Sequence, residues 1–168
     1  MSTSSSNLAT AGIQYVKGDA TRPQGEGAKI LPHIVNDLGL WGAGFVLALS
    51  RRWALPEQAY LAWAETRCLN SLPFVLGQVQ MVKVGENLWV ANMLAQHGVR
   101  GRGNPAPIRY DALRECLRSV GVFAEGVKAS IHAPRFGCGL AGGSWSEVSK
   151  IIEEELCRLS LDVTVYDL

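Results

Sequence analysis

Two glycine-rich segments of the chain have the composition of anion-binding loops. Residues 137–142 read GCGLAG, a G-x-G-x-x-G pattern between an apolar run and a segment with helical spacing. Residues 39–44 read GLWGAG, again between an expected strand and an expected helix. Glycines at such a junction let the backbone approach a ligand closely, and the N–H groups and helix dipole there favour phosphate. Two such loops predict a site that holds a diphosphate from both sides, the alternative being that both are tight turns.

The G-x-G-x-x-G pattern is also the fingerprint of dinucleotide-dependent dehydrogenases. That fingerprint belongs to the first strand-to-helix turn of a long parallel sheet, with an acidic residue at the end of the next strand. Only enough chain for one helix and one strand follows Gly142, and Asp162 begins its expected strand instead of ending it. The position of the loop therefore argues against a dehydrogenase.

Cys138 lies inside the second glycine loop, where a thiol near a helix N-terminus can have a lowered pKa. His132 precedes it on an expected strand, but a cysteine phosphatase needs an arginine about six residues after the thiol, and position 144 is serine. Cys138 is therefore interpreted as a small loop residue. The four cysteines are widely spaced and form no C-x-x-C motif, which predicts no metal site and reduced thiols, as is typical of cytoplasmic proteins.

The composition is that of a globular protein, with 48% hydrophobic and 18% charged residues. A formal charge of +1 gives no reason to expect a general nucleic-acid or membrane surface, and no apolar run is long enough to span a bilayer. Arg100, Arg102 and Arg109 make residues 96–109 locally basic. Contact of this segment with a modified partner or with nucleic acid stays open, against the alternative of a solvated loop.

The expected secondary structure alternates between strands and helices. Strands are expected at residues 13–17, 29–36, 78–84, 88–94, 130–134 and 162–166, and helices at 45–53, 56–69, 109–125 and from 144 onward. Pro32 places its strand at an edge or a bulge, and Ser144 with Glu147 fits a capping box. The order predicts an α/β protein, a three-layer α/β/α domain with a central mixed β-sheet. We expect residues 1–11 to be a disordered leader and residues 12–168 to form one domain.

Four stretches, taken in order, make the chain resemble the macrodomains, the ADP-ribose-binding modules. They are YVKGDA (15–20), HIVND followed by WGAGFVLAL (33–49), APRFGCGL (133–140) and VTVYDL (163–168). The resemblance covers nearly the whole chain and is closest to the branch that contains the terminal ADP-ribose protein glycohydrolase and its bacterial relatives.

The resemblance implies a site for ADP-ribose without a metal or cofactor. Asp19, beside Ala20, is expected to accept a hydrogen bond from the adenine amino group, and Asn36 to face the distal ribose. Tyr166 and Leu168 are expected to wall the adenine pocket. The two phosphate loops are expected to be formed by Gly42, Ala43, Gly44 and Phe45, and by Gly137, Cys138, Gly139 and Leu140.

Two departures from this branch bear on catalysis. The branch has an aspartate where this chain has Ala141, and a nucleophilic lysine where residues 93–97 read MLAQH. We therefore expect no covalent lysine intermediate. The candidate catalytic residues are Gln96, to orient a water molecule, and Asn36 and Asp37, to hold the ribose or polarise a hydroxyl. His97 is a further candidate base. The alternative for Asp37, Gln96 and His97 is that they are ordinary turn or loop residues.

The resemblance implies hydrolysis of mono-ADP-ribose from modified acidic side chains, with ADP-ribose and mono-ADP-ribosylated protein as partners. Three alternatives stay open: a non-catalytic ADP-ribose reader, an ADP-ribose 1″-phosphate phosphatase, and a DNA de-ADP-ribosylase. We expect a cytoplasmic monomer that does not contact membranes.

Overall fold

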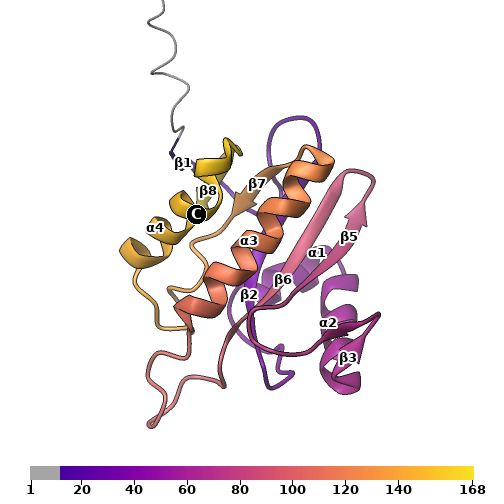
Figure 1. Cartoon of the computed structure of the whole chain (residues 1–168), viewed down its shortest axis with the longest axis vertical. Helices are drawn as coiled ribbons and strands as arrows, with labels where there is room; N and C mark the ends of the chain where they lie inside the picture. Colours follow the sequence, from indigo (N-terminus) through magenta and orange to yellow (C-terminus); the bar gives the residue numbers. More distant parts are fainter. Residues whose placement is uncertain (1–11) are drawn as a thin grey trace, which may run out of the picture.

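A six-stranded mixed sheet runs through the centre of the computed structural model, which describes residues 12–168 (Figure 1). The expected leader, residues 1–11, lies outside the described residues. The strand order is β1-β8-β7-β2-β6-β5. All neighbouring strands are parallel except β5 and β6, which form the expected antiparallel hairpin. The strands are β1 (Gln14–Lys17), β2 (Lys29–Asn36), β5 (Val79–Gly85), β6 (Leu88–Gln96), β7 (Ser130–Ala133) and β8 (Val163–Asp167).

Helices cover both faces of this sheet. Figure 1 shows α3 and α4 in front of the sheet and α1 and α2 behind it. The helices are α1 (Phe45–Arg52), α2 (Leu55–Thr66), α3 (Tyr110–Val127) and α4 (Trp145–Glu155), and a 3₁₀ turn, η2 (Cys157–Leu159), follows α4. The predicted three-layer α/β/α arrangement with a mixed sheet is therefore confirmed.

The two central strands divide their side chains between the two faces because successive residues of a strand point in opposite directions. On β2, Ile30 packs in the core beneath α3 and α4, and Leu31 packs in a second core beneath α1. On β6, Met93 joins the first core, whereas Leu94 packs against α2 residues. A strand buried on both faces reads as a continuous apolar run, which is why KILPHIV carries no alternating pattern.

Pro32 was expected to place its strand at an edge of the sheet or at a bulge, and this prediction was wrong, because the register shift of β2 lies between Val35 and Asn36. β2 is an interior strand that pairs with β6 along its length. Its pairing with β7 covers only Lys29 and Ile30, however, so the ladder on that side ends before the proline. The missing N–H of Pro32 is tolerated because β2 and β7 are no longer hydrogen-bonded there.

The helix expected to reach Leu69 ends earlier. Arg67 caps α2 in the left-handed conformation, with φ 62°. The chain then forms a short hairpin of β3 (Cys68–Leu69) and β4 (Leu72–Pro73). Asn70 and Ser71 between them both have positive φ, as the tightest hairpin turns require.

Ser144 is the N-cap of α4, as predicted, but the capping box is absent. Its side chain makes no capping bond to the helix, and its hydroxyl lies 2.8 Å from the Ser146 hydroxyl instead.

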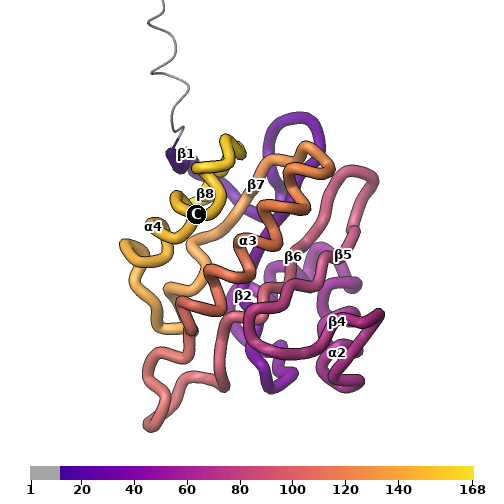
Figure 2. Tube along the Cα trace, viewed as in Figure 1, coloured from indigo at the N-terminus to yellow at the C-terminus, as the bar shows by residue number. Residues whose placement is uncertain are grey.

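The loops that follow β2, β6 and β7 gather at one end of the sheet because the three strands are parallel. Figure 2 shows all three loops at the lower side of the view. In open α/β sheets this carboxyl end is where ligands bind. Between residues 12 and 168, no helix has both the length and the apolar character needed to cross a bilayer.

Candidate functional site

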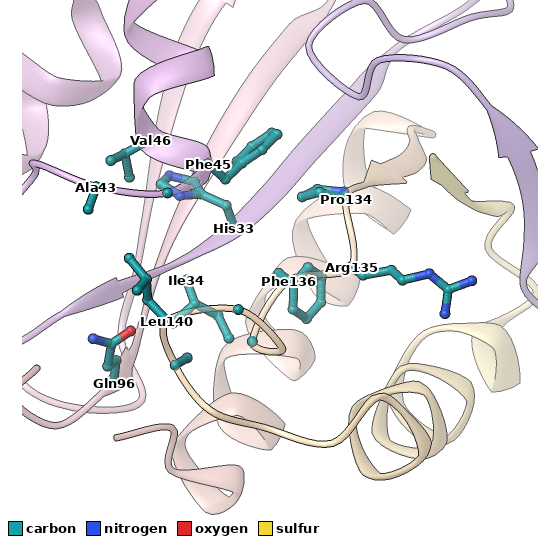
Figure 3. A pocket seen from close by; sticks show the side chains of 14 residues that line it. His33, Ile34, Ala43, Phe45, Val46, Gln96, Pro134, Arg135, Phe136 and Leu140 are labelled. Carbon is teal, nitrogen blue, oxygen red and sulfur yellow. The ribbon is translucent and has the colours of Figure 1, made fainter. Parts of the chain in front are cut away.

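Two adjoining cavities open at the carboxyl end of the sheet. The smaller, about 200 Å³, lies between the two glycine loops, with residues 43–46 on one side and the segment 134–141 on the other (Figure 3). The larger, about 490 Å³, extends toward Asn36, Trp41 and Arg100. The two cavities share five wall residues and so form one continuous groove; these residues are Ile34, Ala43, Val46, Gln96 and Leu140.

The first glycine loop offers unpaired backbone donors to this groove. Gly44 is the N-cap of α1 and has φ 81°, a conformation that favours glycine. The N–H groups of Gly42, Ala43 and Gly44 make no hydrogen bond to another residue between 12 and 168. Gly42 has no atom within 4 Å of the position a Cβ would take. The loop is therefore open to a ligand, and the start of α1 adds the positive end of a helix dipole.

The second glycine loop combines a buried base with an open tip. At Gly137, with φ 82°, a Cβ would lie 2.8 Å from the Ile108 Cδ1 atom. Gly139 has nothing within 4 Å of its Cβ position. The N–H groups of Cys138, Gly139 and Leu140 have no hydrogen-bond partner in the described part of the chain. Both glycines line the smaller cavity, but Gly137 also packs closely against Ile108, whereas Gly139 has open space around it.

Gln96 is the last residue of β6 and lines both cavities. Its side-chain amide donates a hydrogen bond from Nε2 to the Gly98 carbonyl at 3.0 Å, which fixes the orientation of the group. Figure 3 shows its oxygen on the side that faces Leu140. An amide oxygen held in this way can accept a hydrogen bond from a water molecule in the groove.

Asn36 organises the first glycine loop. Its Oδ1 accepts hydrogen bonds from the N–H groups of Leu38 and Leu40, at 3.0 and 3.2 Å, and lies 3.0 Å from the Tyr60 hydroxyl, whose single proton is shared with the Asn36 backbone carbonyl at 2.5 Å. Its Nδ2 donates to the Leu40 carbonyl at 2.8 Å. Because Nδ2 carries two hydrogens, one donor remains for a ligand in the larger cavity, which Asn36 lines.

Asp37 and His97 form a pair between two loops at the same end of the sheet. Asp37 Oδ2 lies 2.7 Å from His97 Nδ1, and Asp37 Oδ1 accepts a hydrogen bond from the Gly98 N–H at 2.8 Å. The side chain of His97 is 61% exposed, and neither residue lines a cavity. Asp37 therefore connects the β2–α1 loop to the β6–α3 loop, and its expected catalytic role stays a prediction.

A buried polar chain ends at the wall of the smaller cavity. Gln80 Nε2 donates to the Ala59 carbonyl, so its Oε1 accepts from Asn92 Nδ2 at 3.0 Å. Asn92 Nδ2 also donates to the Pro56 carbonyl, which leaves its Oδ1 to accept from His33 Nε2 at 2.5 Å. Burial lowers the pKa of His33 to about 4, so its ring is neutral at pH 7. Among residues 12–168, its Nδ1 atom has no partner.

Solved structures with this fold and a similar sequence decide the family. A protein of unknown function from Bacteroides thetaiotaomicron is 52% identical, with a TM-score of 0.88, over 94% of this chain and 99% of that one. A macrodomain protein from Streptomyces coelicolor is 49% identical, with a TM-score of 0.82, over 93% of this chain and 99% of that one. The chain belongs to the macrodomain family. No protein-family model matches the chain.

Curated relatives of this macrodomain differ in length. Mouse chromodomain-helicase-DNA-binding protein 1-like is 32% identical over 166 residues, which are 95% of this chain but 18% of that protein. The macrodomain thus spans less than a fifth of the first curated relatives that it matches. The ADP-ribose 1″-phosphate phosphatase of Saccharomyces cerevisiae is 26% identical over 181 residues, 93% of this chain and 98% of that protein.

A more distant solved structure shares the fold alone. Thermosipho africanus DarTG in complex with ADP-ribose is 19% identical, with a TM-score of 0.72, over 94% of this macrodomain and 42% of that chain.

The residues expected at adenine lie apart from both cavities. Asp19 is half-buried, and its Oδ1 accepts two hydrogen bonds from Thr21; burial alone would raise the pKa of Asp19, but these bonds lower it. Neighbouring Ala20 is buried and Leu168 is fully exposed. Tyr166 is 4% exposed, with its ring beside Gly18. The ligand contacts assigned to these residues stay predictions.

Tyr166 has a structural role that the sequence did not indicate. Its hydroxyl accepts a hydrogen bond from the Gln24 N–H at 2.9 Å, which leaves its proton for His132 Nδ1 at 2.7 Å. His132 Nε2 lies 2.7 Å from the Ser130 hydroxyl. This chain joins the loop between β1 and β2 to strands β7 and β8. Burial lowers the pKa of His132 to about 4, so this ring is also neutral at pH 7.

Arg135 anchors the second glycine loop from outside. Figure 3 shows its side chain directed away from the cavity. Its guanidinium makes two hydrogen bonds to the Asp167 carboxylate, at 2.7 and 3.1 Å, and lies 5.0 Å from the ring centres of both Tyr15 and Trp145. Sequence reasoning missed this contact, since its members are far apart in the chain.

The groove is poor in reactive side chains. Among the described residues, 12–168, no lysine lines either cavity, and Ala141 occupies the wall of the smaller one. Burial raises the pKa of the Cys138 thiol, whose Sγ lies 3.6 Å from the Phe136 carbonyl oxygen. Between residues 12 and 168, no three His, Cys, Asp or Glu side chains are grouped as a metal site requires. The arrangement suits binding and water positioning more than covalent chemistry.

Proposed function

We propose that this macrodomain binds ADP-ribose, with the diphosphate in the smaller cavity. This proposal rests mainly on the two glycine loops. They face each other across a cavity of about 200 Å³, and both present unpaired N–H groups. Phosphate is well matched to such donors at helix N-termini. Arg135 is a cationic residue in the wall of this cavity, but Asp167 engages it, so backbone groups would bind the diphosphate. The yeast ADP-ribose 1″-phosphate phosphatase and the ADP-ribose complex of Thermosipho africanus DarTG support this ligand.

The distal ribose would then occupy the larger cavity. Asn36 and Gln96 border this space, which continues directly from the smaller cavity. The free N–H of the Asn36 amide can donate to a ribose hydroxyl. The anomeric carbon would face the open mouth of the groove, where the attached group has room.

The reaction would be hydrolysis of ADP-ribose linked to a glutamate side chain. Water held by the Gln96 oxygen attacks the anomeric carbon as the bond to the glutamate oxygen breaks. The electron pair leaves with the carboxylate, and the water proton passes to solvent. A carboxylate is a good leaving group, so rigid placement of ribose, diphosphate and water can supply much of the acceleration. No covalent sugar–protein adduct should form, because no lysine of the part of the chain that the structure describes lines the groove.

Because the groove contains few reactive side chains, a second candidate function is that of a reader, which binds ADP-ribose without cleaving it. Ala141 stands where the related glycohydrolases carry an aspartate. Two further activities share the ligand: hydrolysis of ADP-ribose 1″-phosphate, supported by the yeast relative, and removal of ADP-ribose from DNA.

Calorimetry and a time course of product release test these alternatives. We expect micromolar affinity for ADP-ribose, about −8 kcal/mol, and much weaker binding of AMP and NADH. Glutamate-linked, DNA-linked and 1″-phosphorylated ADP-ribose are then incubated separately with the protein. Release from the glutamate substrate should exceed the spontaneous rate. If the protein binds ADP-ribose but releases it from none of the three substrates, the reader function is supported. If it does not bind ADP-ribose, the whole proposal is contradicted.

A further inference from the structure

The mouth of the larger cavity is surrounded by exposed aliphatic side chains. Among residues 12–168, three of the large hydrophobic residues that line this cavity are strongly exposed. Leu40 is 53% exposed, Val99 43% and Leu140 51%. We refer to these three residues as the mouth patch. Single exposed aliphatic residues are common, whereas a group around a cavity rim marks a site of interaction.

The mouth patch is assembled from three separate loops. Leu40 lies between β2 and α1, Val99 between β6 and α3, and Leu140 between β7 and α4. The three residues do not belong to one helix or one strand, because each comes from a different loop. Their convergence follows only from the parallel order of the strands, so the patch belongs to the same end of the sheet as the groove.

The same rim is positively charged, and the neighbouring Asp37 carboxylate is engaged by His97 and by the Gly98 N–H. Residues 38–44, 98–108 and 134–144 contain no aspartate or glutamate. Arg100 lines the larger cavity, and Arg102 follows in the same loop. Neither is in an ion pair within the described part of the chain. Arg109 differs, since its guanidinium is held by the Ala106 and Ile108 carbonyls. Two arginines are therefore available to an anionic partner.

We infer that the mouth patch, with Arg100 and Arg102, docks the polypeptide that carries the ADP-ribose. The matching partner is an acidic segment with an aliphatic residue beside the modified glutamate. This inference rests on the proposed function, because the groove must hold the ADP-ribose that brings the segment to the mouth. It deepens that function by specifying the residues that flank the modified glutamate.

The side chains of the mouth patch favour polypeptide over single-stranded nucleic acid. Nucleic-acid grooves use exposed aromatic rings on which bases stack. Here the rim consists of leucine and valine, and the one aromatic residue of the larger cavity, Trp41, is half-buried. Its ring packs 5.4 Å from His33 and 5.5 Å from Tyr60, measured between ring centres.

The test compares binding of four probes to the full chain. Two are peptides of equal length that carry ADP-ribose on one side chain through a hydrolysis-resistant linkage. One has leucine and acidic residues beside that position, and the other has glycine and serine. The third probe is a single-stranded oligonucleotide carrying the same group, and the fourth is free ADP-ribose. Binding is measured, so the result does not depend on turnover.

The variant Leu40→Ser/Val99→Ser removes two members of the patch. Its matched control is Leu61→Ser/Val122→Ser, which alters exposed residues of α2 and α3 that line neither cavity. Wild-type protein should bind the leucine-acidic peptide about tenfold more tightly than the glycine-serine peptide, as burial of one aliphatic side chain would give. The patch variant should bind the two peptides with equal affinity, whatever its affinity for free ADP-ribose, because both peptides carry the same ADP-ribose group. The control should retain the wild-type preference.

The variant Arg100→Glu/Arg102→Glu should also bind the leucine-acidic peptide more weakly than the wild-type protein does. Added salt should reduce the difference between the two affinities. Equal wild-type affinity for the two peptides, or tighter binding of the oligonucleotide, would overturn the inference. Failure to bind free ADP-ribose would instead overturn the proposed function, so the two failures can be told apart.

Discussion

Gly137 and Gly139 lie two residues apart in one loop, but a side chain would meet different surroundings at each. Gly139 faces empty space, whereas a Cβ at Gly137 would collide with the Ile108 side chain. Gly139→Val should therefore lower ADP-ribose affinity by about 100-fold or more and leave the thermal midpoint nearly unchanged. Gly137→Val should cost about 2–4 kcal/mol of stability, through overpacking and positive φ. Calorimetry and thermal unfolding of both variants separate the two effects. If Gly139→Val binds ADP-ribose normally, the loop is only a tight turn and does not contact phosphate.

Gln96 tests whether the groove positions water. Gln96→Ala removes the amide oxygen at the border of the two cavities without touching the glycine loops. We expect the hydrolysis rate to fall about tenfold to 100-fold, the range typical of one positioning group, while ADP-ribose affinity changes less than threefold. Single-turnover release measured beside calorimetry gives both numbers. An unchanged rate would remove Gln96 from the mechanism.

At the scale of elements, Asn36 connects strand β2 to the loop that precedes α1. Asn36→Ala deletes every side-chain bond to Leu38, Leu40 and Tyr60 and leaves the buried Tyr60 hydroxyl with one acceptor fewer. We expect a loss of about 2 kcal/mol in unfolding free energy and faster amide exchange in residues 38–44. Activity should fall more than affinity, because the ribose contact is lost as well. Asn36→Asp, which keeps the acceptor, is the control and should retain most of the stability.

At the scale of the whole molecule, two buried histidines make stability depend on pH. The pKa of His33 and that of His132 are each lowered to about 4 by burial. In the unfolded chain both would take up protons near pH 6.5, while in the folded protein they stay neutral. Stability should therefore be constant above about pH 6.5 and fall between pH 6.5 and 4, by about 1.4 kcal/mol per pH unit for each histidine.

Denaturant titrations from pH 7.5 to 4.5 measure this slope. His132→Asn should reduce the slope by about half. If the slope of stability against pH is unchanged in His132→Asn, other groups cause the loss of stability at acid pH.

The sequence alone predicted the family of this macrodomain and most of its elements, although not the β3–β4 hairpin. The bounds of β2 match the apolar run 29–36, and both glycine loops lie at the strand-to-helix junctions where they were expected. These features depend on signals within a few residues: hydrophobic spacing and the torsion angles that glycine permits. The order of the four macrodomain stretches needed no structure either.

The tertiary structure decided what those residues contact. Asn36 was expected to contact the ribose. In the structure, most hydrogen bonds of its side chain are made to its own loop and to Tyr60. Asp37 meets His97, a residue 60 positions away, because β2 and β6 are neighbours in the sheet. The groove itself exists because β2 and β7 stop pairing after Ile30 and the loops beyond them separate. Strand order and pairing length are properties of the whole packed sheet, and no local pattern in the sequence carries them.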